Sequence, residues 1–426
     1  MHFKQILDSL FHQNRSFGIH PIRMCSLCIL FVVVTTSGAQ DLSSYEKPME
    51  KSMYSEALKD SVHLEIILPK GLEKNTTQEY PIIYVLDRQL RNNYKYNLYT
   101  IDYLSSFQKM PKAIIVGITF NSVNRIPWTL PNASGGKADD LIYFLESELK
   151  SELAKRYPIS KFNLLIGHSR TAIFSSYALS KKHDFFNAAI ASSVSNFDFG
   201  DALQKDVFES FLDTISASEH TYYYYFSAGE GAYGDAHEFA ADSLSLFLNS
   251  KELPKTLQWN YFKYKVAHDV TPGLTVNRAL SNIFKEYGRR MYLCFKVAKE
   301  SPQSVPWSKY TEIYESISKD LELNIQPSEL FFNSIGSEYD FNYKNDYGKK
   351  HLAFASEILL KAIDTYPNEH IYYTWIGEIY MRLENFNQGD YYLNKSIQLI
   401  QNDKSISESE RLVLLGEVNE YKRNGK

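Results

Sequence analysis

Uninterrupted apolar runs, separated by helix-length segments, constrain the fold of this chain most. Residues 80–87 read Tyr-Pro-Ile-Ile-Tyr-Val-Leu-Asp and residues 113–118 read Ala-Ile-Ile-Val-Gly-Ile. Such runs are typical of strands that are buried on both faces of a parallel sheet. Further strands are expected at residues 62–69, 162–166, 188–193, 221–227 and 258–266, and an amphipathic helix at residues 138–157. The alternation predicts an α/β fold with a mostly parallel central sheet flanked by helices.

A small-residue turn, Gly167-His168-Ser169-Arg170-Thr171, lies between a predicted strand and a predicted helix. This is the context of a nucleophile elbow, whose usual pattern is G-x-S-x-G, and Thr171 stands where the last glycine is usual. The turn exposes a serine hydroxyl at the head of a helix, where N–H groups and the positive end of the helix dipole favour a developing oxyanion. Ser169 is therefore the predicted nucleophile.

The predicted base is His268, which follows the strand expected at residues 258–266. Ligands of open α/β sheets bind at the carboxyl ends of the strands, so a histidine on that loop can reach the serine and accept its proton. His183 and His237 lie in helix-like surroundings, where a structural role is the commoner explanation. His168 flanks the serine and is expected to pack or to orient its neighbours.

An acid that orients the base is expected between serine and histidine in chain order. Glu230 follows the strand at residues 221–227 and is the preferred candidate, while Asp235, Glu238 and Asp242 compete with it. The group His237, Glu238 and Asp242 matches no familiar set of metal ligands, so no metal site is predicted.

Backbone N–H groups are the expected oxyanion donors. One is the amide of Arg170, which directly follows the nucleophile, and the other is the amide of Arg88 or Gln89, after the strand at residues 80–87. A donor of this kind contributes roughly 3–4 kcal/mol to stabilisation of the transition state.

The chain resembles an esterase family of α/β-hydrolases that includes enterochelin-type siderophore esterases and esterase D-like enzymes. The resemblance covers about residues 50 to 287 and rests on residues 80–87, 114–118, 167–169, 185–193, 229–230 and 268–272. It implies Ser169, His268 and Glu230 as nucleophile, histidine and acid, a small-molecule ester substrate and no cofactor. The chain departs from the family at Arg88, Thr171 and Ala172, where glycines are usual.

The N-terminus is predicted to be an export signal, residues 1–39. Basic residues precede the apolar run Cys28–Val34, and Ser37 and Ala39 are placed as a signal-peptidase site. Met24 is an alternative start, and a buried helix or a membrane anchor is the alternative interpretation. The run is too short for the ~20 residues of a stable membrane span. Export to the periplasm or the extracellular space would leave Cys294 as the one cysteine of the mature protein.

A different pattern begins after the α/β-hydrolase domain, which is expected at residues 40–288. Residues 289–327 are predicted to form a helical connector, and residues 328–426 an all-α helical-repeat domain. Phe332, Ile335, Gly336 and Tyr339 recur as Tyr373, Ile376, Gly377 and Tyr380, with the spacing of a tetratricopeptide repeat. Ser407 and Glu410 are spaced as a capping box of a final helix. Two repeats are few for a free-standing solenoid, so docking against the first domain or a protein partner is expected.

Length and charge agree with this organisation. A chain of 426 residues suggests two domains and a leader. A formal net charge of −4 gives no reason to expect nucleic acid or an anionic membrane as a partner. We predict an exported serine carboxylic ester hydrolase that acts through an acyl-enzyme. A peptidase or thioesterase would use the same residues, and the alternative from another class is a weakly catalytic hydrolase-like scaffold whose repeats bind a protein.

Overall fold

Eight strands form one sheet in the part of the chain that the computed structural model describes, residues 42–72, 78–194, 202–230, 234–300, 307–342 and 349–424. The strands are β1 Met49–Ser55, β2 Asp60–Ile67, β3 Tyr80–Val85, β4 Ile114–Thr119, β5 Ile159–His168, β6 Ala188–Ser192, β7 Tyr222–Glu230 and β8 Leu257–Ala267. Their order across the sheet is β1-β2-β4-β3-β5-β6-β7-β8. The predicted export signal lies outside the described residues.

The sheet is parallel except at one edge. β1 pairs with β2, and β2 with β4, in antiparallel register, and all other neighbours are parallel. The predicted strands are all present, while β1 was not predicted. It is an edge strand with mostly exposed side chains, so it lacks the apolar run by which a buried strand is recognised.

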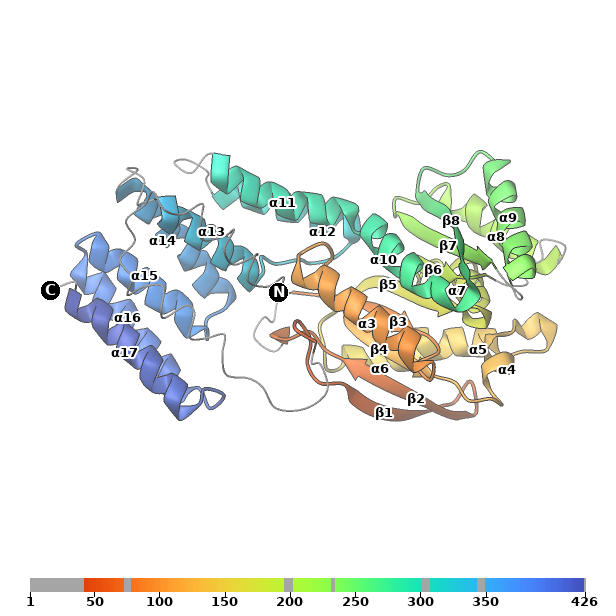
Figure 1. The fold of residues 1–426 in the computed structure, drawn as a ribbon, viewed down its shortest axis with the longest axis horizontal. Helices are drawn as coiled ribbons and strands as arrows, with labels where there is room; N and C mark the ends of the chain where they lie inside the picture. Colours follow the sequence, from red (N-terminus) through yellow and green to blue (C-terminus); the bar gives the residue numbers. More distant parts are fainter. Residues whose placement is uncertain are drawn as a thin grey trace, which may run out of the picture. The chain divides into compact units, whose positions relative to one another are not determined.

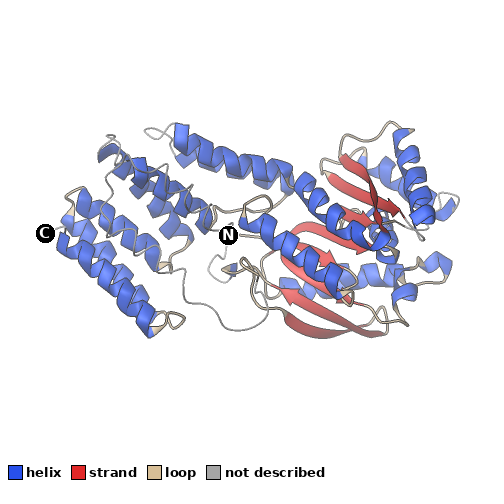
Figure 2. Ribbon diagram, in the orientation of Figure 1, coloured by secondary structure: helices blue, strands red, loops and turns tan. Residues whose placement is uncertain are grey.

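Helices cover both faces of the sheet, which explains the uninterrupted apolar runs (Figures 1 and 2). Ile83 and Val85 face one cluster of buried side chains, shared with α3 (Arg91–Ser106) and α10 (Thr271–Ile283). Ile82 and Tyr84 face the other cluster. That second cluster includes side chains of α7 (Arg170–Lys181), α8 (Ala202–Ile215) and α9 (Gly234–Asn249). The fold is therefore a mostly parallel sheet flanked by helices, as the sequence predicts.

The helix expected at residues 138–157 is interrupted. It consists of α5 (Ala138–Tyr143), a π-helical turn at Phe144–Leu149 and α6 (Lys150–Ala154). Phe144, Leu145 and Leu149 in the π-turn are fully buried. The predicted helix is thus present, but its periodicity did not indicate the change in helical pitch.

The C-terminal region is all helical. Its helices are α11 Lys285–Glu300, α12 Trp307–Leu321, α13 Glu329–Asn342, α14 Lys349–Thr365, α15 His370–Arg382, α16 Phe386–Asn402 and α17 Glu408–Asn424. The expected connector thus includes most of α11 and all of α12. Buried side chains of both helices, the free Cys294 among them, join the cluster that also contains Ile83 and Phe332. This apolar core is therefore continuous from the sheet into the C-terminal helices.

Consecutive helices of this region pack closely. A Cβ atom added to Gly377 in α15 would lie 2.6 Å from Leu393 Cγ in α16, so only glycine permits this approach. At the last helix, Ser407 Oγ accepts the Glu410 N–H at 3.3 Å, which is one half of the predicted capping box. Within the described residues, no helix has the length and apolar character that a membrane span needs.

Candidate active site

Ser169 occupies a strained turn between β5 and α7. Its backbone has φ 56° and ψ −118°, a conformation that costs a non-glycine residue about 1–3 kcal/mol. Gly167 permits the close crossing of strand and helix, because a Cβ atom there would lie 2.2 Å from the Thr171 carbonyl oxygen. These features are those of a nucleophile elbow, with the serine at the head of α7 as the sequence predicts.

Thr171 stands where a glycine is usual in the elbow, and its hydroxyl contacts both the elbow and the loop after β3. Its hydroxyl accepts the His168 N–H at 2.9 Å and lies 2.8 Å from Asp87 Oδ2, to which it can donate. The side chain is fully buried. Thr171 thus connects the elbow to the loop after β3, a role that a glycine has no atoms to fill.

Asp87 organises that loop. Its carboxylate is 3% exposed. It accepts two hydrogen bonds from Arg125, from Nε at 2.7 Å and from Nη2 at 2.6 Å, and a third from Gln89 Nε2 at 2.7 Å. Gln89 Oε1 in turn accepts the Phe120 N–H at 2.9 Å. A buried carboxylate with charge-assisted partners of this kind holds the surrounding backbone rigidly.

Of the three predicted oxyanion donors, one amide is already hydrogen-bonded within the described chain and two are not. The Arg88 N–H donates to the Ile118 carbonyl oxygen at 2.9 Å, so it is occupied and Arg88 is removed from the candidate donors. Its guanidinium pairs with Glu65 at 2.7 Å and with Glu50. By contrast, the amides of Gln89 and Arg170 have no acceptor among the described residues. These two amides remain available to an oxyanion.

Ser169 and His268 line one open cleft of about 390 Å³. The other lining residues are Gln89, Leu90, Phe120, Asn121, Ser122, Arg125, His168 and Asp269. His268 begins a 3₁₀ turn directly after β8, so the carboxyl ends of β3, β5 and β8 all contribute to the cleft. No hydrogen bond joins the Ser169 and His268 side chains in this state of the described chain.

His268 is flanked by two further imidazoles. Its ring centroid lies 4.7 Å from that of His168 and 4.2 Å from that of His237. Burial, and then the charges of these two neighbours, lower the pKa of His268 to about 4, against a smaller opposite effect of Asp269. The imidazole is therefore neutral at pH 7, which is the protonation state that a general base requires.

His168 and His237 flank His268, and each of these two rings is held by hydrogen bonds to the backbone. His168 Nε2 lies 3.2 Å from the His268 carbonyl oxygen, and since a carbonyl only accepts, this nitrogen carries the proton. Burial lowers the pKa of His237, and hydrogen bonds to the backbone of Val194 and Ser193 oppose that shift. A structural role was predicted for His237, away from the site. Its position becomes apparent only when α9 packs beside β7 and β8.

The Glu230 carboxylate makes no hydrogen bond to the predicted base, His268, in the described chain. It is the exposed last residue of β7, and its register partner on β8 is Ala267, one residue before the histidine. His268 Nδ1 is buried without a hydrogen-bond partner in the described chain. Of the competing acids, Glu238 and Asp242 pair with Lys263 at 2.6 and 2.9 Å. The side chain of Asp235 lies outside the described part.

Three side chains could approach a metal ion. One ligand atom each of His168, His268 and Asp269 lies within 4.8 Å of the others. Ligand atoms of a tetrahedral zinc ion are about 3.4 Å apart, given bonds of ~2.1 Å. The ring of His168 is also held by the His268 carbonyl oxygen. The arrangement favours a base held between imidazoles over a metal centre.

Comparisons with known proteins show the family and the fold of this chain. The family model described as "Putative esterase" matches residues 55–268, a range that begins in β1 and ends at His268. A crystal structure of an IroE-like serine hydrolase from Shewanella oneidensis is similar, with a TM-score of 0.55 and 18% identity over 73% of this chain and 98% of that one. A structure of an uncharacterised protein from Capnocytophaga ochracea has a TM-score of 0.54 and 16% identity over 88% of this chain and 100% of that one. No curated protein matches.

Proposed function

This chain belongs to the esterase family of α/β-hydrolases and is an ester-hydrolysing enzyme, and we propose that it acts as a serine hydrolase on carboxylic esters through an acyl-enzyme. The observation that carries this proposal is Ser169 in a strained elbow, in one cleft with the neutral imidazole of His268 and the Gln89 loop. Peptide and thioester substrates would need the same groups, and the family membership favours the ester.

The chemistry follows from the positions of the groups. Ser169 Oγ attacks the ester carbonyl while the His268 imidazole takes the hydroxyl proton, and a bond forms between Oγ and the carbonyl carbon. The amides of Arg170 and Gln89 donate to the oxyanion. Collapse breaks the bond to the alcohol, which leaves with the proton from His268, and a water molecule repeats the sequence on the acyl-enzyme.

The base works in this proposal without a carboxylate partner. The rings of His168 and His237 contact that of His268, and these contacts restrict its rotation in place of the hydrogen bond that an acid would provide. A base with a pKa of about 4 is intrinsically weak, so the serine is activated less than in a complete triad. We therefore expect slow turnover.

Active-site labelling tests the proposal. Purified protein is treated with a fluorophosphonate probe and, separately, with p-nitrophenyl acetate, beside Ser169→Ala, His268→Ala and the control Ser122→Ala. Ser122 lines the cleft without a predicted role. Labelling of the wild type and the control, and its loss in Ser169→Ala, are expected. A folded wild type that neither labels nor turns over would contradict the enzyme mechanism and support the scaffold alternative.

Export and helical repeats complete the proposal. The charge and apolar pattern of residues 1–39 supports a cleaved signal peptide and a periplasmic or extracellular location. Mass spectrometry of the N-terminus of the protein from its own host tests this, since cleavage after Ala39 would make Gln40 the first residue. The periodic match between α13 and α15 supports tetratricopeptide-like repeats, which would dock within the chain or bind a protein partner.

A further inference from the structure

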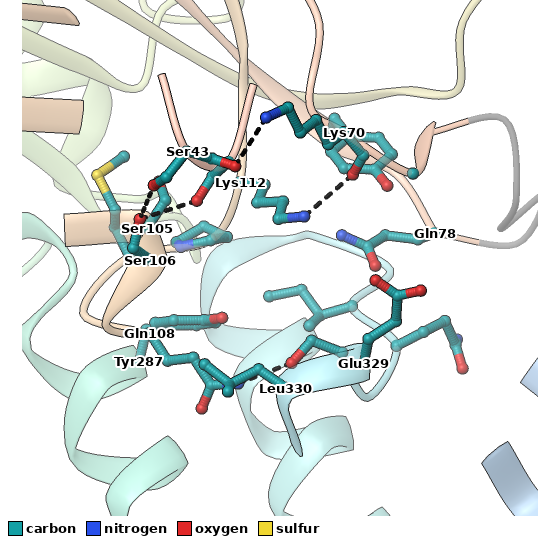
Figure 3. Close-up of a pocket in the computed structure, with 18 of the residues that line it drawn as sticks. Ser43, Lys70, Gln78, Ser105, Ser106, Gln108, Lys112, Tyr287, Glu329 and Leu330 are labelled. Carbon is teal, nitrogen blue, oxygen red and sulfur yellow. Dashed lines mark hydrogen bonds between the residues drawn. The ribbon is translucent and has the colours of Figure 1, made fainter. Parts of the chain in front are cut away.

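A second pocket lies at the amino ends of β3 and β4, at the opposite end of these strands from the serine (Figure 3). Its volume is about 500 Å³, which is within the range of small-molecule sites. One wall comes from the loops before β3 and β4 and the end of α3, and the other comes from α11, the α12–α13 connection and Tyr366 after α14. A ligand here would contact both the sheet and the C-terminal helices.

Lys112 projects into this pocket with most of its hydrogen-bonding capacity unused (Figure 3). Its ammonium group has three N–H donors, and its one hydrogen bond among the described residues goes to the Lys70 carbonyl oxygen at 3.0 Å. No carboxylate of the described chain lies within ion-pair distance. Burial lowers the pKa of Lys112, and the carboxylates of Glu329, Asp102 and Glu46 oppose this shift without cancelling it. The ammonium group therefore has N–H donors left for a ligand.

Two tyrosine hydroxyls at the same pocket also lack partners. Tyr80 is 3% and Tyr287 is 8% exposed, and both line the pocket. Neither hydroxyl has a hydrogen bond within the described ranges. Burial raises the pKa of both, so each hydroxyl keeps its proton and remains a donor. Each hydroxyl therefore keeps a donor that a ligand of the pocket could use.

The N-terminus of α13 adds a positive electrostatic potential at the same pocket. Ser328 caps the helix by accepting the Phe331 N–H at 3.1 Å, and its hydroxyl also accepts Gln108 Nε2 at 2.7 Å. Ser328, Glu329 and Leu330 line the pocket, so the positive end of the helix dipole lies at its wall. Lys112, two hydroxyl donors and the helix N-terminus can donate to a negatively charged acceptor, while Glu46 and Glu329 give the same lining two carboxylates.

We propose that this pocket binds a small molecule through an oxyanion, a carboxylate or a phosphate, that accepts hydrogen bonds from Lys112, Tyr80 and Tyr287. The site does not depend on chemistry at Ser169, since it lies at the amino ends of the strands, whereas Ser169 follows the carboxyl end of β5. Occupancy would join the loops of the sheet to α13 and thereby stabilise the association of the two regions.

Titration calorimetry at constant ionic strength tests the proposal, with inorganic phosphate and succinate as the two probes. Saturable binding of one probe at one site is expected, and which probe binds distinguishes a phosphate ligand from a carboxylate. Lys112→Met should weaken binding by about tenfold or more, and Tyr80→Phe by about fivefold. Lys109→Met is the matched control, because Lys109 is exposed and outside the pocket, and it should bind as the wild type does.

Two results would overturn the proposal. One is the absence of saturable binding with both probes, and the other is binding that neither Lys112→Met nor Tyr80→Phe weakens. Far-UV circular dichroism and the thermal unfolding transition of each variant report whether it is folded, independently of the pocket and of Ser169. If Lys112→Met does not fold, Tyr80→Phe carries the test, because it removes a single oxygen atom without a partner in the described structure.

Discussion

Thr171 Oγ1 lies 2.8 Å from Asp87 Oδ2, and this contact connects the residue two positions after the nucleophile to the residue two positions before Gln89. The proposed oxyanion hole needs one amide from each of these segments, Arg170 and Gln89. Their separation must be held within a fraction of an ångström while charge develops on the substrate. The substitution of threonine for the usual glycine thus adds a positioning group to the elbow.

Thr171→Val should therefore impair turnover more than substrate binding. Valine keeps the shape of threonine but leaves the His168 N–H and the Asp87 carboxylate without this partner. We expect kcat to fall by about tenfold or more with KM nearly unchanged, and the free energy of unfolding to fall by about 1–3 kcal/mol. Steady-state kinetics and chemical denaturation measure the two effects.

Thr171→Ser is the control for this change, because it restores the hydroxyl while removing a methyl group. Recovery of kcat in this variant would assign the effect to the hydrogen bond. A valine variant with the kcat of the wild type would show that the two segments keep their geometry without it.

The pKa of His268 sets the acid limit of activity. Because burial and two neighbouring imidazoles lower it to about 4, kcat/KM should stay near its plateau until the pH falls toward 4, instead of declining around 6.5. His168→Ala and His237→Ala remove causes of the shift, so both should move the acid limb to higher pH. Rates between pH 3.5 and 8 on an uncharged ester measure this, and an acid limb near 6.5 in the wild type would refute it.

The same shift affects stability. Between pH 6.5 and about 4 the unfolded chain binds a proton at His268 that the folded chain does not. The stabilising contribution is therefore complete above pH 6.5 and is lost as the pH falls through the folded pKa. Denaturation of wild type and His268→Ala at several pH values tests the sign, since the variant should lose less stability over this range. Equal losses would contradict the assignment.

Strand order made part of this site predictable from sequence. Ser169, His268 and Gln89 follow β5, β8 and β3, and the carboxyl ends of parallel strands meet at one edge. The occupied Arg88 amide was not predictable, because its acceptor Ile118 depends on how the loop after β3 meets β4. The contact of His237 with His268 likewise depends on the packing of α9, on which local sequence carries no signal.

Glu230→Gln should have little effect. Glu230 is exposed, and no hydrogen bond joins it to His268. We expect kcat/KM to change by less than about threefold, whereas loss of a true triad acid costs up to about 10⁴-fold in kcat. The comparison with His237→Gln is informative, because that variant disturbs a ring in contact with the base. A loss above a hundredfold in Glu230→Gln would show that this carboxylate reaches His268 during catalysis.

Substitution of Gly377 tests how tightly α15 and α16 pack against each other. Alanine there would place Cβ 2.6 Å from Leu393 Cγ, closer than any relaxed contact, so Gly377→Ala should cost about 1–3 kcal/mol of unfolding free energy. Leu393→Ala alone should also destabilise, by about 2–5 kcal/mol through the cavity it leaves. Because the new methyl group would partly fill that cavity, the double variant should be more stable than the sum of the two losses predicts. Gly416→Ala is the control, since nothing lies within 4 Å of a Cβ there, and it should stabilise α17 by roughly 0.5–1 kcal/mol.

Strict additivity of the losses in the Gly377→Ala, Leu393→Ala double variant would mean that Gly377 and Leu393 do not share this contact in solution.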